Sequence, residues 1–304
     1  MTRILSVTYS QSGQLEAIVS NITAIFKGHA EVVHERLKPV PDFPFPWKGI
    51  DFYDAMPESV KLIPSELQPL KCNLAANYDL VILGYPVWFL SPPIPLTTFL
   101  KSDNGRKLLA GKPVITVIGA RNMWVNAQED VKKMIADAGG NHVGNIALCD
   151  THNNLVSVVT IIYWMGTGRK DRLWGIFPKP GIPEMAVEEA DRFGPPILKA
   201  VRSGNYVGLQ EELIRLKAVE LSPNVVSTEN KGKKMFRLWA SFVLKKGDPG
   251  NKARAGRLHL FKWYLLFVIF VISPLVTAIF YLTMPLFLKR IKSNLKYYQS
   301  VSLK

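Results

Sequence analysis

The sequence predicts an α/β fold, a doubly wound parallel sheet of five strands in the order 2-1-3-4-5. Short apolar runs alternate with segments whose apolar residues recur at helical spacing. The apolar runs are continuous, as in strands buried on both faces of a parallel sheet. Strands that alternate with helices form right-handed crossovers. In this strand order the ligand crevice lies at the carboxyl ends of strands one, three and four.

The elements of this fold are expected in order along residues 1–205. Ile4–Thr8 is the first strand, and Gln14–Phe26 is a helix because its apolar residues share one face. Ala30–His34 is the second strand. The remaining strands are Leu80–Gly84, Pro113–Gly119 and Val143–Leu148, and the remaining helices are Pro95–Leu100, Ala127–Ala138 and Glu184–Arg202.

Two inserts interrupt this alternation. Seven prolines between residues 39 and 70 predict an irregular first insert, since proline fixes φ and lacks an N–H donor. The second insert, about 151–180, contains the apolar run Leu155–Met165, which at 11 residues is too short to span a bilayer. We expect this run to form a lid or a wall for an apolar substrate. A buried helix and a segment dipping into a membrane are the other interpretations.

The positive charge is concentrated after residue 205. Residues 206–304 hold 17 of the 38 Lys and Arg but 5 of the 24 Asp and Glu, a balance of +12. Residues 1–205 carry the remaining +2 of the formal charge of +14. A basic tail binds nucleic acid or an anionic lipid surface, and the residues around the charge decide between them.

The tail favours lipid. Trp263–Leu288 is 26 residues without a charge, and about 20 suffice to cross the hydrocarbon core. Basic residues flank this segment on both sides. A single span would therefore place one basic cluster on the non-cytoplasmic side, against the positive-inside tendency. Pro274 can break the helix, so a re-entrant hairpin with both ends cytoplasmic is favoured slightly over a single span. The tail therefore divides into a basic amphipathic linker (206–262), the hydrophobic membrane segment (263–288) and a basic end (289–304).

Within the linker, Lys231–Lys246 mixes basic and apolar residues in a pattern typical of an amphipathic helix on anionic lipid. We expect the protein on the cytoplasmic face of a membrane, the inner membrane if the source is bacterial. The N-terminal MTRILSVTYS has no long apolar run and does not resemble a secretory signal. Cys72 and Cys149 are expected as buried, reduced thiols, and no metal site is expected.

The turn after the first strand is the first candidate site. Amides at a helix N-terminus are unpaired donors at the positive end of the helix dipole, and serine hydroxyls and a glycine suit a phosphate there. A serine cap with a turn glycine is the alternative. No Gly-Lys-Ser/Thr follows and Gly-x-Gly-x-x-Gly is absent, which excludes an NTP loop and a dinucleotide fingerprint. The candidate residues are Ser10, Gln11, Ser12, Gly13, Gln14 and Leu15.

This turn resembles the FMN phosphate loop of the flavodoxin superfamily, which includes quinone reductases. The likeness covers about residues 1–205. The family usually shows Ser/Thr-x-Thr/Ser-Gly-x-Thr/Ser, and Leu15 stands where a final hydroxyl often sits, so one phosphate donor is missing here. The resemblance implies a flavodoxin-like fold with FMN as cofactor.

The loop after the third strand, Gly84–Pro93, is similar to the family's Gly-x-Pro-x-aromatic loop, which lies against the flavin ring. Flat aromatic side chains can stack on that ring, and prolines stiffen the loop. Core packing is the alternative for the tryptophan. The candidates that the resemblance implies are Pro86, Val87, Trp88 and Phe89.

The loop after the fourth strand stands where the family has its third flavin loop. Backbone amides and the Asn122 side chain can bond the edge of the ring, and Arg121 can place positive charge beside a reduced, anionic flavin. A solvated arginine and a core tryptophan are the alternatives. The candidates in this loop are Ala120, Arg121, Asn122 and Trp124.

Asp150 and His152 follow the fifth strand and should reach the same edge of the sheet. Either can act as a catalytic acid or base beside the flavin. A loop histidine without a catalytic role is the alternative.

A closer resemblance comes from the Tyr-Ser-Gln-Ser-Gly-Gln-Leu turn, the Gly-Tyr-Pro-Val-Trp-Phe loop and the basic, hydrophobic C-terminus. Together they look like the bacterial dialkylresorcinol condensing enzymes, which are FMN-dependent aromatases. This implies a membrane-associated oxidoreductase that oxidises a dialkylcyclohexanedione to a dialkylresorcinol. The expected partners are an apolar small molecule, anionic membrane lipid, NAD(P)H or a redox partner, and a second copy of the chain, but no nucleic acid.

Three other functions stay open at this stage. An NAD(P)H-dependent quinone reductase would share the flavin site and would also benefit from a membrane, although no nicotinamide site is evident. A non-enzymatic, membrane-tethered electron carrier would not need the two inserts. A membrane scaffold that has lost its flavin is the third.

Overall fold

The computed structural model of the protein describes residues 1–303. Its central sheet has the order β2-β1-β5-β6-β7, and every neighbouring pair is parallel. Without the two short strands of the first insert, this is the predicted order 2-1-3-4-5, so the flavodoxin-like doubly wound fold is confirmed. The strands are β1 (Arg3–Thr8), β2 (Glu31–Arg36), β5 (Leu80–Pro86), β6 (Pro113–Ala120) and β7 (Asn141–Cys149).

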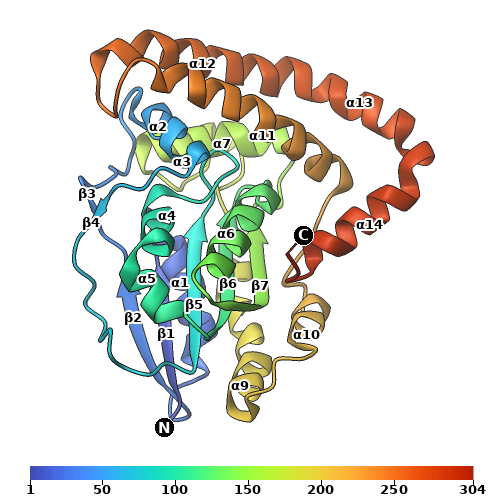
Figure 1. The fold of residues 1–304 in the computed structure, drawn as a ribbon. Coiled ribbons are helices and arrows are strands. Elements are labelled where there is room, and N and C mark those ends of the chain that lie inside the picture. Colours follow the sequence, from blue (N-terminus) through green and yellow to red (C-terminus); the bar gives the residue numbers. More distant parts are fainter. Residues whose placement is uncertain (304) are drawn as a thin grey trace.

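Helices cover both faces of the sheet and bury its apolar strands (Figure 1). On one face α1 (Gln14–Ala24) packs against the short helix η2 (Glu189–Phe193) and α9 (Gly194–Ser203). The other face carries α4 (Ile94–Lys101), α5 (Asp103–Leu109) and α6 (Val125–Asp137). The helix over 184–202, predicted to be interrupted at Pro195 and Pro196, is indeed divided, but the break comes earlier: α8 (Glu184–Glu188) ends before η2, and the two prolines stand in the first turn of α9.

The first insert is less irregular than predicted. It forms the short helices α2 (Asp51–Asp54) and α3 (Met56–Lys61), and β3 (Pro39–Val40) pairs with β4 (Glu66–Leu67). Pro57 stands in the first turn of α3, where a missing N–H is harmless. Proline therefore limits the length of these elements without preventing them.

The second insert contains one long helix, α7 (Asn154–Thr167), followed by the single turn η1 (Leu173–Gly175). The Asn153 side chain caps α7 by accepting the Leu155 N–H, and Gly168 ends the helix in a left-handed conformation. The predicted apolar run thus forms a helix at the edge of the domain.

Residues 206–262 pack on the domain. α10 (Leu209–Arg215) lies along β7, and the Gln210 side chain accepts the Asn145 N–H at 2.7 Å. α11 (Pro223–Leu244) packs against α3 and α6. The predicted linker is therefore continuous with the fold on one side, while Met235, Leu238 and Phe242 of α11 stay exposed.

The hydrophobic segment forms one helical rod across the top of the molecule in Figure 1. α12 (Ala255–Phe267), a π-helical turn η4 (Val268–Ile272) and α13 (Ser273–Thr283) follow without a break, so the hairpin predicted at Pro274 is absent. The wider π turn accommodates the missing N–H donor of proline. The chain bends later, at η5 (Met284–Phe287), into α14 (Leu288–Gln299).

Within residues 1–303, Lys252–Gln299 is the one helical stretch that is long and apolar enough to cross a membrane. Both of its ends are attached to the domain. Arg254, fully buried, holds Glu58 through two hydrogen bonds of 2.9 and 3.0 Å. At the other end Gln210 donates to the Gln299 carbonyl at 2.9 Å, and Lys132 donates to the Ser302 carbonyl at 3.0 Å.

Candidate functional site

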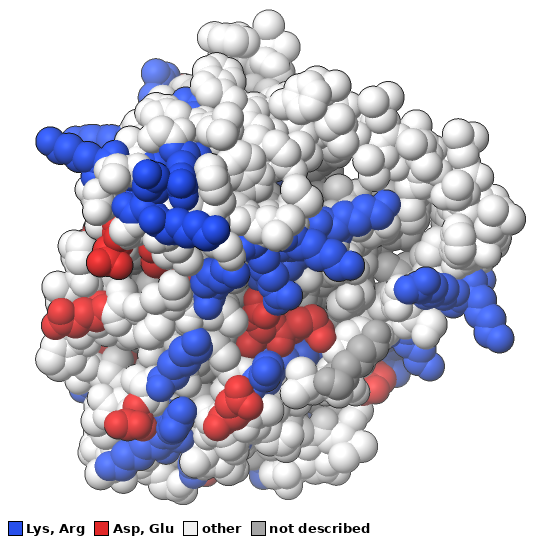
Figure 2. Space-filling model, turned by 45° about the horizontal axis from the view of Figure 1, so that its top comes forward, with Lys and Arg blue, Asp and Glu red and all other residues white. Residues whose placement is uncertain are grey.

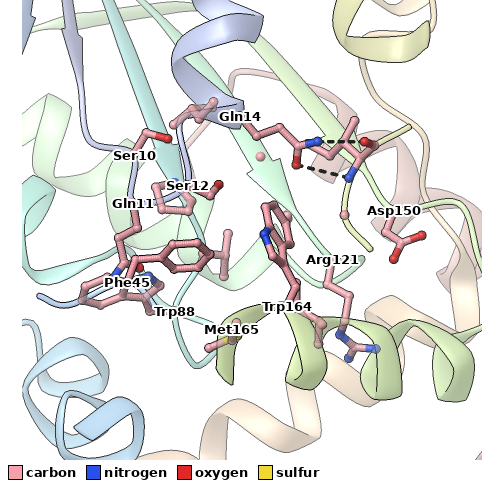
Figure 3. A pocket seen from close by; sticks show the side chains of 18 of the residues that line it. Ser10, Gln11, Ser12, Gln14, Phe45, Trp88, Arg121, Asp150, Trp164 and Met165 are labelled. Atoms are coloured by element: carbon pink, nitrogen blue, oxygen red, sulfur yellow. Dashed lines mark hydrogen bonds between the residues drawn. The ribbon is translucent and has the colours of Figure 1, made fainter. Parts of the chain in front are cut away.

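A cavity of about 170 Å³ opens where β1, β5 and β6 end, which is the predicted edge of the sheet. The turn after β1, the loop after β5 and the loop after β6 all contribute to its wall. The three candidate loops therefore converge on one pocket, as the sequence predicts. Figure 3 shows their side chains arranged around it.

The turn after β1 keeps several donors available. Ser10 Oγ accepts the Gly13 N–H at 3.1 Å, which closes the turn. Gly13 has a φ of 80°, and an added Cβ would meet no atom within 4 Å, so glycine is needed for the backbone conformation alone. The Nε2 atom of Gln11 is buried without a hydrogen-bond partner in the described chain. An orphaned donor of this kind in a cavity indicates a missing acceptor.

Gln14 lines the cavity, and its side chain is hydrogen bonded to another segment of the chain. Its Nε2 donates to the Ile182 carbonyl at 2.8 Å, and its Oε1 accepts the Ile182 N–H at 3.3 Å (Figure 3). Gln14 therefore attaches the end of the second insert to the turn. Leu15 is buried at the start of α1 and lines the cavity, whereas Ser12 is exposed at its mouth.

The loop after β5 divides into two parts. Pro86, Val87 and Trp88 line the cavity. Phe89 does not, because its backbone adopts a φ of 49° and its ring packs 4.4 Å from the ring of Phe52. The Trp88 ring is edge-on to its neighbours Tyr9, Phe43 and Trp47, and is largely buried among them.

Lys233 of α11 holds this loop in place. Leu90 also has a positive φ, 60°, so two successive residues other than glycine occupy a costly region. The Lys233 ammonium donates to the Leu90 carbonyl at 2.8 Å and to Ser91 Oγ at 2.6 Å, and it pairs with Asp130 at 2.7 Å. These bonds stabilise the strained turn. Burial lowers the pKa of Lys233, and Asp130 opposes that effect.

Arg121 is the cation of the cavity. Its Nη1 donates to the Asn154 side chain at 2.6 Å and to the Asn154 carbonyl at 3.1 Å. Within the described residues no carboxylate lies within ion-pair distance of it. Burial lowers the pKa of Arg121 to about 10, partly offset by Asp150, so it stays protonated at neutral pH. A half-buried guanidinium without a counter-ion suits an anionic ligand.

The other candidates of this loop lie differently. Ala120 lines the cavity beside Arg121. Asn122 does not line it and donates to Asn154 at 2.8 Å, which leaves the buried Asn122 Oδ1 without a partner in the described chain. Trp124 is 1% exposed and precedes α6, so it belongs to the core and does not flank the pocket.

Glu229 of α11 holds the end of the loop after β6, as Lys233 holds the loop after β5. Its carboxylate accepts the Asn126 N–H at 2.7 Å and the Val125 N–H at 3.3 Å, at the first turn of α6. Burial raises the pKa of Glu229 to about 7, although these hydrogen bonds and Lys233 oppose the effect. α11 thus fixes the loops after β5 and β6 through two buried ionisable side chains one turn apart.

Asp150 lines the cavity, whereas His152 lies in a neighbouring one. Asp150 Oδ1 is 2.6 Å from His152 Nδ1, and Asp150 Oδ2 accepts the Ser157 hydroxyl at 2.6 Å. The His152 ring is one-third exposed, at 34%. The pair therefore joins the cavity to solvent through two titratable groups.

The two inserts supply the outer wall, which sequence reasoning placed near the site without naming its residues. α7 contributes Trp164, which projects into the middle of the pocket, and its ring lies edge-on 5.9 Å from that of Phe45 (Figure 3). The Trp47 N–H donates to the Met165 carbonyl at 2.8 Å and joins the inserts. Gly181 is needed here, since a Cβ would lie 2.7 Å from the Trp164 ring.

The wall is mainly apolar. Besides the residues of the three loops, Asp150, Gly181 and Ile182, it is formed by six apolar residues of the inserts: Phe45, Trp47, Phe52, Ile161, Trp164 and Met165. The run 155–165 lies in α7, which contributes three of these residues to the wall, whereas its role as a lid or wall for an apolar substrate stays a prediction. In residues 1–303 no group of three or more His, Cys, Asp and Glu is placed to hold a metal ion. Cys72 is buried and Cys149 partly so, and both are free thiols.

No protein-family model and no curated protein sequence matches the chain. Among solved structures, a flavoprotein from Lactobacillus acidophilus in complex with FMN is 22% identical, covers 48% of this chain and 93% of its own, and has a TM-score of 0.38. Flavodoxin 1 from Bacillus cereus is 14% identical, covers 65% and 98%, and scores 0.35. A flavone reductase is 12% identical, covers 66% and 63%, and scores 0.36. These sequence identities and TM-scores are too low to assign a ligand or a role to any residue of the cavity. The fold assignment rests on the strand order.

Proposed function

We propose that the chain is an FMN-dependent oxidoreductase that rests on a membrane and acts on an apolar substrate. The observation that carries the proposal is the convergence of the β1 turn, the β5 loop and the β6 loop on one cavity at the carboxyl edge of the sheet. This is where the doubly wound fold places a mononucleotide.

The residues present fit FMN. The turn offers the N-terminal amides of α1, the exposed Ser12 hydroxyl and the orphaned Gln11 donor to a phosphate. Arg121 offers positive charge to the ring, and Trp164 offers a flat surface. When bound, FMN would supply two-electron acceptor chemistry.

The substrate would be apolar because the residues of the inserts that line the cavity are apolar. Six aromatic or aliphatic residues of the inserts face the pocket, and its charged members are Arg121 and Asp150. In the reaction, the aromatic wall would exclude water and orient the substrate. Asp150 would take up a proton from the substrate, and His152 would pass that proton to solvent, since they lie 2.6 Å apart and only His152 is substantially exposed.

We propose that the membrane lies on the outer face of α12 and α13. This face carries Trp263, Phe267, Leu275 and Leu282, exposed at 65, 55, 59 and 80%, and clusters of exposed apolar side chains are typical of interaction sites. Arg254 attaches the start of the rod to the domain, and the end of α14, which follows the rod, is attached to the same domain. A helix held in this way would lie along one leaflet instead of crossing it. It would also be close to the cavity, because both occupy the carboxyl edge of the sheet (Figure 1).

The resemblance of the loops to the dialkylresorcinol enzymes extends the proposal to one reaction. Bound FMN would supply the two-electron acceptor for oxidation of an alkylated cyclohexanedione to the aromatic resorcinol, and Asp150 would take up the proton that the substrate loses. The apolar wall suits its alkyl chains. Turnover of a dialkylcyclohexane-1,3-dione to an aromatic product tests this reaction, and bleaching of the flavin by NAD(P)H alone would favour a quinone reductase instead.

The FMN site is tested with Ser12→Asp. Ser12 is exposed and makes no side-chain hydrogen bond in the described chain, so the fold should tolerate the change. A carboxylate in the turn should repel the phosphate and weaken FMN binding by about 100-fold or more. Riboflavin, which lacks the phosphate, should bind about equally to the variant and the wild type. An equal loss for both flavins, or no flavin binding by the wild-type protein, would overturn the proposal.

A further inference from the structure

A second cavity, of about 540 Å³, lies between α11 and the bend formed by α13, η5 and α14. We refer to it as the α11–α14 groove. It shares no residue with the flavin cavity, and nothing in the proposed reaction uses it. Its position matters because one wall, α13, belongs to the rod that would face the membrane.

Three cations line the groove and none of its residues is acidic. Lys231 and Lys234 stand three residues apart on α11, and Arg290 faces them from α14. None of the three makes an ion pair or hydrogen bond within residues 1–303. Three unpaired cations from two helices around one hollow repel one another unless an anion lies between them.

The rest of the lining is mostly hydrocarbon. Val276, Ile279 and Phe280 of α13, with Phe287 of η5 and Ile291 of α14, form an apolar wall. Ser227 and Asn230 of α11 add neutral polar groups near the lysines. The groove therefore presents a cationic part and an apolar part side by side, which matches a molecule with an anionic head and hydrocarbon chains.

We propose that the α11–α14 groove binds one molecule of an acidic glycerophospholipid drawn from the membrane. Its phosphate lies among Lys231, Lys234 and Arg290, and an acyl chain lies along α13. This rests on the proposed membrane association, which it sharpens from a general charge attraction to a defined lipid site. A free nucleotide or nucleic acid would leave the apolar wall uncovered.

The surrounding surface agrees with this occupant. Figure 2 shows Lys and Arg side chains forming a band across this face, next to the uncharged surface of the rod. A lipid held at such a border keeps its head at the level of the basic band and its chains at the level of the apolar surface. α11 would then contact lipid on one side and, through Glu229 and Lys233, the two flavin loops on the other.

The site is tested by native mass spectrometry of the full chain in a neutral detergent with dioleoylphosphatidylglycerol or dioleoylphosphatidylcholine. The wild-type protein should retain one phosphatidylglycerol and far less phosphatidylcholine. The triple variant Lys231→Gln, Lys234→Gln, Arg290→Gln should retain phosphatidylglycerol about tenfold less well or worse. The matched control Lys245→Gln, Lys246→Gln, Lys292→Gln removes the same charge from exposed positions outside the groove and should behave as the wild type.

A second variant distinguishes loss of the lipid site from loss of the fold. Ser227→Trp fills the groove without changing any charge, and it should also lose the bound lipid while its circular dichroism and melting temperature stay close to those of the wild type. Equal loss in the groove and control variants, or equal retention of both lipids, would overturn the site. Flotation of the wild-type protein with vesicles of the two lipids tests membrane association separately, because single-lipid retention in detergent needs no bilayer.

Discussion

Gln11 and Arg121 are two polar members of the cavity wall that lack a partner suited to their charge or donor. The Gln11 amide has a buried donor without a partner, and the Arg121 guanidinium has no counter-ion in the described chain. Each costs free energy in the folded chain, since a buried donor or charge has lost its water. An anionic ligand bound beside them would supply the missing acceptor and counter-charge. Polar groups left unpaired in this way are typical of a binding site.

Replacing Gln11 by Leu should therefore have opposite effects on stability and on binding. Removing the orphaned donor should leave the flavin-free protein as stable or stabilise it by about 1 kcal/mol. The same change should weaken FMN binding by about tenfold, because one donor to the ligand is lost. Thermal unfolding of the flavin-free protein and fluorescence titration with FMN measure the two effects. A variant that is destabilised and binds FMN normally would contradict this role.

Replacing Arg121 by Gln should lower the midpoint potential of bound FMN. The cation favours the reduced, anionic flavin, so its loss should shift the two-electron potential down by about 30–60 mV, at about 30 mV for each 1.4 kcal/mol. Arg121→Lys keeps the charge and should shift the potential much less. Spectroelectrochemistry measures both variants. An unchanged potential in Arg121→Gln would mean that the guanidinium acts only through its bonds to Asn154.

At the scale of elements, α11 connects regions that are remote in sequence. Lys233 lies 143 residues from Leu90, and Glu229 lies 103 residues from Asn126, yet each pair is hydrogen bonded. A helix predicted to lie on lipid therefore also holds the loops after β5 and β6. Its buried charges are satisfied by loop and helix-terminal groups, which is why they can be buried.

Glu229 should give the protein a stability that falls as the pH rises. Its pKa is raised from 4.5 to about 7 by burial, so the native state holds the proton more firmly than the unfolded chain. Between about pH 4.5 and 7 this contribution to the free energy of unfolding falls by up to about 3 kcal/mol, and it is constant above that range. The side chain of the Glu229→Gln variant cannot titrate. The free energy of unfolding of the variant should therefore rise relative to that of the wild type as the pH rises.

Urea unfolding of the two proteins at pH 5, 6, 7 and 8 measures this difference. Other titrating groups are common to both chains, so they cancel in the comparison. A difference in unfolding free energy that stays constant from pH 5 to 8 would show that Glu229 titrates normally. Glutamine still offers an oxygen to the Asn126 N–H, so gross loss of the fold is not expected.

At the scale of the whole molecule, the apolar rod starts on the domain, and α14 leads the chain from the end of the rod back to the same domain. Arg254 anchors its start to Glu58 on α3, and the chain after α14 returns to α6 and α10. The Lys132 ammonium donates to the Ser302 carbonyl, and the buried His142 ring lies 3.3 Å from the Val301 carbonyl. A span across the bilayer would break one of these attachments.

Cysteine labelling should place both flanks of the rod on one side of the membrane. Lys252→Cys and Lys296→Cys stand at exposed positions before and after it. In sealed vesicles of one orientation, an impermeant maleimide should label both or neither, whereas a single span would expose only one. Burial raises the pKa of Cys72 to about 11 and that of Cys149 to about 12, so the native thiols should react slowly. Leu282→Cys, in the exposed apolar face, should be protected by lipid.

The sequence by itself determined the sheet, its strand order and the edge where the candidate loops meet. Periodicity and continuous apolar runs report local structure, and parallel crossovers have few topologies. It also predicted the apolar run that forms α7 and the charge-free segment that forms the exposed rod. These properties depend on neighbouring residues in the chain.

Only the tertiary structure decided which residues of each loop face the pocket. A left-handed φ turns Phe89 away from Trp88, and the start of α6 carries Trp124 into the core. It also decided that Glu229 and Lys233 reach the loops and that the rod is fixed at both ends without a break at Pro274. The physical reason is the same in each case: these positions are set by packing between segments far apart in the chain, which no local pattern records.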